Sequence, residues 1–229
     1  MRCKINPSQH CRERLAEAAR YALFRRLAPV LRHNMAGAFQ PLGMVSATLE
    51  RQLKKPAPDI PAISLKSSQM NNLVREASAH CLNLMTWLAP KPNELITVAK
   101  GVEDAADLVL TQLLFKGFRV VNQTGVVQVE LPGVVTQNVF LAALIALTDA
   151  ATAPATVLLS AQPGDSEVVL TLAILPAQAE MLLACEPSYR NLGWEDVQAL
   201  ADMAAVRIVR TEDRVELHCP TNAPSIEFP

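Results

Sequence analysis

The first quarter of the chain repeats apolar residues at helical spacing with little interruption. Asn6 followed by Pro7 is a favourable N-cap and first-turn pair, so the pattern predicts a helix from there to about Lys55. Pro29 and Pro41 each remove a backbone donor inside this segment. We expect them to bend the helix rather than end it.

A proline-rich segment separates this helix from the next one. Three prolines within residues 54–62 predict a loop, and a second helix is expected from about residue 64 to residue 88. Two further prolines in residues 90–93 then indicate a linker. Residues 1–90 are therefore predicted to form a helical hairpin domain.

The second half of the chain alternates between helical and strand-like patterns. Helices are predicted at 102–116, 136–151 and 194–205, and strands at 118–121, 126–131, 156–161, 167–174, 206–210 and 214–219. One helix followed by two strands thus occurs three times, which predicts an α+β domain with one sheet and its helices on one face. We assign residues 94–220 to this domain and 221–229 to a surface tail.

Apolar residues follow coiled-coil spacing in both predicted hairpin helices. They are Phe24, Ala28, Leu31, Met35, Ala38, Leu42, Val45 and Leu49 in the first, and Met70, Leu73, Ala77, Leu84 and Trp87 in the second. This register places His33 at an outward-facing position and His80 on the buried seam. Because a hairpin buries only one stripe between its helices, we expect two copies to pair into a dimeric four-helix bundle.

Composition and charge argue against several classes of function. The net charge is −1 and aromatic residues make up 4% of the chain, which argues against a nucleic-acid binder. The 5 cysteines are scattered without a Cys-x-x-Cys pair, so they indicate neither a zinc site nor a disulfide framework. No signal-peptide pattern and no apolar run of membrane-spanning length occur. We expect a cytoplasmic protein that does not contact the membrane.

The four histidines differ in their sequence surroundings. His10 and His218 have no convergent partner in the predicted elements. His33 lies near Arg25, Arg26 and Arg32. That positive charge fits either an ordinary solvated face or a docking surface for an acidic partner.

Residues 31–40, Leu-Arg-His-Asn-Met-Ala-Gly-Ala-Phe-Gln, resemble the phosphoacceptor box of histidine kinases. They are closest to the variant with a glutamine seven residues after the histidine, here Gln40. The predicted layout also resembles that family, which combines a dimerisation and phosphoacceptor hairpin with a Bergerat-type ATP-binding domain. The resemblance implies that His33 is the phosphoacceptor. An acid often follows the histidine in such boxes, whereas Asn34 can orient an imidazole but cannot take its proton.

The ATP-binding motifs of the kinases are missing. Ile145 and Asp149 stand at the two positions of the asparagine box, and isoleucine cannot ligate magnesium. Residues 175–179, Leu-Pro-Ala-Gln-Ala, replace the Asp-x-Gly-x-Gly box. The glycine-rich lid is reduced to Leu192-Gly193-Trp194. We therefore expect ATP binding to be lost and no cofactor to be required.

This combination resembles the histidine phosphotransferases of phosphorelays. It implies a homodimer that relays a phosphoryl group to or from a response-regulator receiver domain, which supplies the magnesium. The implied catalytic residues are His33 and the orienting Asn34, and the implied binding residues are Arg25, Arg26, Arg32 and Gln40. The alternatives are a non-catalytic dimeric adaptor that binds a response regulator or kinase, an ATP-dependent kinase, or an accidental similarity of layout.

Overall fold

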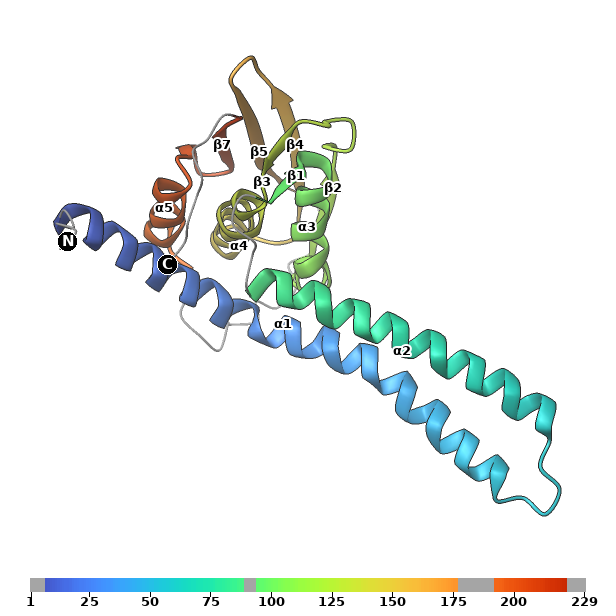
Figure 1. Cartoon of the computed structure of the whole chain (residues 1–229). Helices are drawn as coiled ribbons and strands as arrows, with labels where there is room; N and C mark the ends of the chain where they lie inside the picture. The colour runs from blue at the N-terminus through green and yellow to red at the C-terminus, as the bar shows by residue number, and fades with distance from the viewer. Residues whose placement is uncertain (1–6, 89–93, 177–191, 222–229) are drawn as a thin grey trace, which may run out of the picture. The chain divides into compact units, whose positions relative to one another are not determined.

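The computed structural model describes residues 7–88, 94–176 and 192–221 (Figure 1). The chain divides into two compact units, Met1–Leu27 together with Pro90–Pro229, and Ala28–Ala89. Helix α1 (Pro7–Leu53) contributes residues to both units. The sequence predicts one domain for residues 1–90, whereas the contacts group the first turns of α1 with the α+β domain.

A buried apolar stripe explains why the start of α1 belongs to the α+β unit. Ala16, Ala19, Leu23 and Leu27 recur every three or four residues, and each is at most 1% exposed. A helix in water would leave these side chains accessible. Their burial removes apolar surface from water and stabilises this part of α1 within the unit.

The two predicted hairpin helices are confirmed. Helix α1 continues through Pro29 and Pro41, and α2 (Ile60–Leu88) follows a loop at residues 54–59. Helix α2 begins four residues earlier than predicted because Asp59 caps it. Its carboxylate accepts a hydrogen bond from the Ala62 amide at 3.1 Å.

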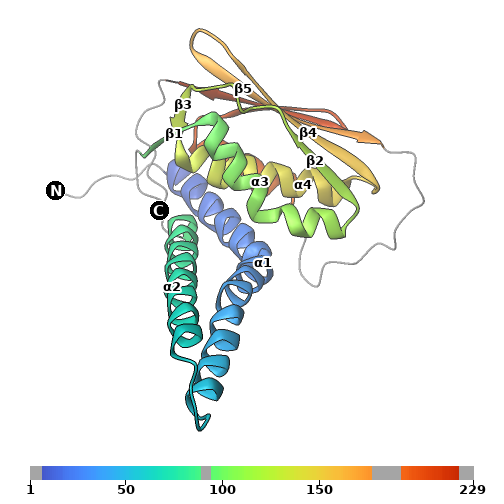
Figure 2. The same cartoon turned by 90° about the vertical axis from the view of Figure 1, so that its right-hand side faces the viewer.

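The predicted α+β class is also confirmed. The main sheet contains β2 (Phe118–Asn122), β4 (Ala155–Pro163), β5 (Glu167–Pro176), β7 (Arg214–Pro220) and β6 (Arg207–Arg210), in that order. The β2–β4 pair is parallel, and the other pairs are antiparallel. Helices α3 (Val98–Phe115), α4 (Leu141–Ala150) and α5 (Trp194–Met203) lie on one face of this sheet (Figures 1 and 2).

The strand predicted at 126–131 is wrong for most of its length. Only β3 (Glu130–Pro132) is a strand, and it pairs with β1 (Leu95–Thr97), which the sequence analysis missed, in a separate two-stranded sheet. The residues before β3 hydrogen-bond to helix α3 instead of to a strand. The carbonyls of Val127 and Val129 accept hydrogen bonds from the first amides of α3, so they cap that helix instead of joining a ladder.

The helix predicted at 136–151 has two parts. Residues Val135–Phe140 form a π-helical segment, η1, which leads directly into α4. Every residue from Leu141 to Thr148 is buried, as expected for a helix that is apolar on all sides. In the described part of the chain, no helix is both long enough and apolar enough to cross a membrane.

Candidate functional site

A hollow of about 400 Å³ lies between α1 and α2 in the hairpin unit. Figure 2 shows the two helices side by side. The lining residues are His33, Asn34, Gly37, Ala38 and Pro41 from α1, and Leu73, Glu76, Ala77 and His80 from α2. They repeat at three- to four-residue intervals on each helix, so the two helices turn one face each towards the hollow.

Small side chains explain why the helices leave space here. Gly37, Ala38 and Ala77 occupy the middle of the facing stripes, where larger residues would fill the gap. A Cβ atom added at Gly37 would meet no atom within 4 Å. Gly37 is exposed, so the hollow is open to solvent at this residue.

The structure confirms the prediction for one hairpin histidine and contradicts the prediction for the other. His33 is exposed as predicted, and it lines the hollow together with the half-buried Asn34. The prediction that His80 is buried on the seam is wrong, because His80 is exposed and lines the same hollow. Ala77, one turn earlier, is the buried residue, at 2% exposed. Small residues leave an unfilled hollow between the helices at the level where the heptad pattern predicted close packing.

Arg26 does not belong to a docking surface around His33, so that prediction is wrong. Its guanidinium is buried and donates hydrogen bonds to the carboxylate of Asp149, from Nη2 at 3.0 Å and from Nε at 3.3 Å. The guanidinium of Arg25, which is exposed, stacks 6.0 Å from the Tyr21 ring centre.

The remaining predicted binding residues, Arg32 and Gln40, are exposed on α1. Neither side chain lines the hollow. Of the six predicted site residues, the structure therefore brings together only His33 and Asn34. It adds Glu76 and His80 from the second helix, which sequence reasoning did not assign to a site with His33.

Asp149 is the centre of a buried ionic cluster. Besides Arg26, the ammonium of Lys116 at the end of α3 contacts the same carboxylate. Ile145, one turn earlier on α4, is 3% exposed. The two asparagine-box positions thus hold an apolar side chain and a carboxylate already paired with two cations. These residues do not fit a magnesium–nucleotide site.

The other two segments compared with kinase nucleotide motifs are residues 175–179 and 192–194. Residues 177–179 lie outside the described residues. Gly193 serves as the N-cap of α5, and its amide donates a hydrogen bond to the Asp196 carboxylate at 2.9 Å. Within the part of the chain that the structure describes, no group of three His, Cys, Asp or Glu side chains could hold a metal ion.

His218 has partners that the sequence analysis did not find. Its Nδ1 lies 2.9 Å from a carboxylate oxygen of Glu167 and 2.7 Å from Nη2 of Arg207. These residues lie on β5 and β6, the two strands that flank β7. The expectation of no convergent partner is therefore wrong, because strand pairing joins residues that are distant in sequence.

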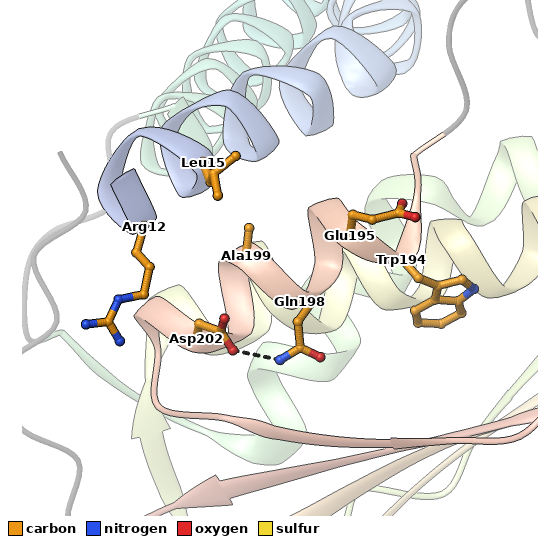
Figure 3. A pocket seen from close by; sticks show the side chains of 7 residues that line it. All are labelled: Arg12, Leu15, Trp194, Glu195, Gln198, Ala199 and Asp202. Atoms are coloured by element: carbon orange, nitrogen blue, oxygen red, sulfur yellow. Dashed lines mark hydrogen bonds between the residues drawn. The ribbon is translucent and has the colours of Figure 1, made fainter. Parts of the chain in front are cut away.

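A second hollow of about 400 Å³ lies between the start of α1 and α5 (Figure 3). It is lined by Arg12 and Leu15 of α1, and by Trp194, Glu195, Gln198, Ala199 and Asp202 of α5. Gln198 donates a hydrogen bond to Asp202 at 2.7 Å. The lining contains two carboxylates, Glu195 and Asp202, and no His or Cys side chain.

No model of a known protein family matches this sequence. A comparison with curated proteins also finds no match. Solved structures with a similar course of the chain include histidine kinase AdeS of Acinetobacter baumannii, at 16% identity and a TM-score of 0.40, covering 83% of this chain and 98% of that one.

Two further solved structures have similar sequence identities and TM-scores. A bacterial phosphotransferase is 15% identical with a TM-score of 0.39, covering 86% of this chain and 95% of the other. The blue-light-activated histidine kinase EL346 of Erythrobacter litoralis is 16% identical with a TM-score of 0.44. The match covers 80% of this chain and 63% of the kinase chain.

Proposed function

We propose that this protein is a histidine phosphotransferase-like signalling protein that exchanges a phosphoryl group with response-regulator aspartates through His33. The observation that carries the proposal is the position of His33. It is exposed on a long helix, at the edge of a hollow, within the ten residues that resemble a phosphoacceptor box. A nucleophile in such a position can reach a partner's active site without repacking a core.

The transfer is a direct displacement. A neutral imidazole nitrogen of His33 attacks the phosphorus atom of an aspartyl phosphate on the partner. A P–N bond forms, the P–O bond breaks, and the electron pair remains on the aspartate carboxylate. Asn34, which lines the same hollow, orients the imidazole through its amide. Magnesium held by the partner would neutralise charge on the transferring phosphoryl group.

We also propose that two hairpins pair in a homodimer. Several large apolar side chains of the hairpin are exposed in the single chain, among them Met35 at 41%, Phe39 at 47% and Met85 at 63%. A second hairpin would cover such surface. Light scattering at micromolar concentration should give the mass of a dimer, and Phe39→Glu should give a folded monomer. A monomeric wild-type chain would contradict the pairing.

ATP has no role in this proposal. Ile145 offers no oxygen ligand, and Asp149 is already neutralised by Arg26 and Lys116. Calorimetry with magnesium and ATP should therefore detect no binding tighter than about millimolar. A micromolar dissociation constant would favour an ATP-dependent kinase instead.

The alternative is a non-catalytic dimeric adaptor that binds a response regulator or a kinase. Asn34 favours it, because an amide cannot accept a proton at neutral pH. The adaptor requires the same exposed hairpin but no phosphohistidine. Formation of a phosphohistidine therefore distinguishes the two functions.

The decisive experiment incubates the full chain with a panel of phosphorylated receiver domains and detects acid-labile phosphate on it. We expect His33→Ala to abolish phosphate acceptance while the melting temperature stays unchanged. His10→Ala is the matched control, because His10 is an exposed histidine on the same helix. A His33→Ala chain that still binds its receiver domain and still supports signalling at the wild-type level would leave only the adaptor function.

A further inference from the structure

His33 and His80 lie at the same level of the hairpin. His33 is twenty residues before the end of α1 at Leu53, and His80 is twenty residues after the start of α2 at Ile60. At 1.5 Å per residue, each histidine is about 30 Å along its helix from the connecting loop. Because the chain reverses at that loop, the two histidines come opposite each other at one end of the hollow.

The lining residues agree with this antiparallel register. Pro41 of α1 and Leu73 of α2 are the lining residues nearest the loop, and His33 and His80 are those farthest from it. Both histidines are exposed, so neither is held by the packing of a core. The hollow of about 400 Å³ between the helices is large enough for a phosphoryl group, and both histidines line it.

We propose that His80 is a positioning residue that donates a hydrogen bond to the phosphoryl group carried by His33. This inference rests on the proposed function and adds a second residue to its site. A phosphoryl group on His33 carries negative charge and three acceptor oxygens. An imidazole has at least one N–H in either of its protonation states, so His80 can always donate. Hydrogen bonds to charged acceptors are stronger than those between neutral groups.

The other lining residues make His80 the natural donor. Glu76 lies one turn nearer the loop and offers only carboxylate oxygens, which would repel a phosphoryl group. Leu73, Ala77 and Pro41 have no polar side-chain atom. On the α2 side of the hollow, His80 is therefore the side chain that can donate a hydrogen bond.

The test loads the full chain with potassium phosphoramidate, a small phosphoryl donor that needs no partner protein. Mass spectrometry then maps the modified residue, and ³¹P NMR records its resonance and its loss at neutral pH. We expect the label on His33. His80→Ala should shift that resonance and make loss of the phosphoryl group about fivefold faster, the effect of one hydrogen bond.

Two matched variants separate hydrogen bonding from a general structural effect. His80→Gln keeps an N–H donor and should restore most of the wild-type lifetime, whereas His10→Ala should change nothing. A wild-type lifetime and resonance in His80→Ala would overturn the inference, as would a label that maps to His80 or no label on His33. The proposed function is tested separately, because it fails only if phosphorylated receiver domains transfer nothing to His33.

Discussion

Arg26 of α1 and Asp149 of α4, 123 residues apart in the chain, form a buried ion pair. Their side chains are 7% and 5% exposed, and the guanidinium contacts the carboxylate through two nitrogens. This bidentate geometry is the strong form of such a pair. It fixes the first part of α1 against α4.

Removing Arg26 should destabilise the protein strongly. Arg26→Ala leaves the carboxylate of Asp149 buried with only Lys116 as a cationic partner, so we expect a loss of about 3 kcal/mol in the free energy of unfolding. Urea denaturation followed by circular dichroism measures it. Arg32→Ala, at an exposed position, is the control and should cost less than about 0.5 kcal/mol. Equal stability of the two variants would show that the buried pair does not stabilise the fold.

Two glycines in helices should respond oppositely to alanine. A Cβ on Gly101 of α3 would lie 2.6 Å from Oγ1 and 2.8 Å from Cγ2 of Thr136, so Gly101→Ala should cost about 1–3 kcal/mol by overpacking. Gly43 of α1 has no atom within 4 Å of that position. Gly43→Ala should therefore stabilise by up to about 1 kcal/mol through helix propensity. Melting curves of both variants check the difference, and a Gly101→Ala chain as stable as wild type contradicts the packing.

The thiol of Cys219 should resist alkylation in the folded protein. Burial, with a smaller contribution from the nearby carboxylate of Glu167, raises the pKa of Cys219 to about 12. The thiolate is the reactive form, so iodoacetamide at mildly alkaline pH should label the exposed Cys11 and spare Cys219 until the chain unfolds. Mass spectrometry of digests reads both sites, and equal labelling of the two in the native protein would contradict this burial.

The raised pKa of Cys219 makes the free energy of unfolding depend on pH. Above the ordinary value of 9.0, the unfolded chain releases the Cys219 proton while the folded chain keeps it. The unfolded state then binds fewer protons, so the free energy of unfolding should fall as pH rises from about 9 towards 12. Cys219→Ala should lose this part of the dependence, which urea titrations at several pH values would show.

His80 should matter little for stability, in contrast to its neighbour Ala77. Because His80 is exposed, His80→Ala should change the free energy of unfolding by less than about 0.5 kcal/mol. Ala77→Asp would place an unpaired charge at a position that is 2% exposed and should destabilise the hairpin by several kcal/mol. Thermal melts of the two variants compare them directly, and strong destabilisation by His80→Ala would mean that His80 packs in a core after all.

Local patterns in the sequence were sufficient to predict most of the helices and strands. The apolar repeat with its proline-rich break predicts α1 and α2, and the β-branched runs predict β4, β5, β6 and β7, because helical and strand periods leave distinct patterns over a few turns. Short elements without such a pattern were missed. Strand β1 has three residues, and the segment before β3 owes its conformation to the α3 amides that it caps.

The exposure of His33 also followed from the sequence, since its position relative to the apolar repeat placed it on an outer face. The partners of the charged and polar groups did not follow. Arg26 and Asp149 meet through packing, and His218 and Glu167 meet through strand pairing, between segments that are distant along the chain. His33 and His80, on different helices, line the same hollow. Hydrophobic periodicity decides which face of an element is buried, but it carries no information about which other element covers that face. Only the tertiary contacts therefore decided that Arg26 is buried beside Asp149 and that His80 shares a hollow with His33.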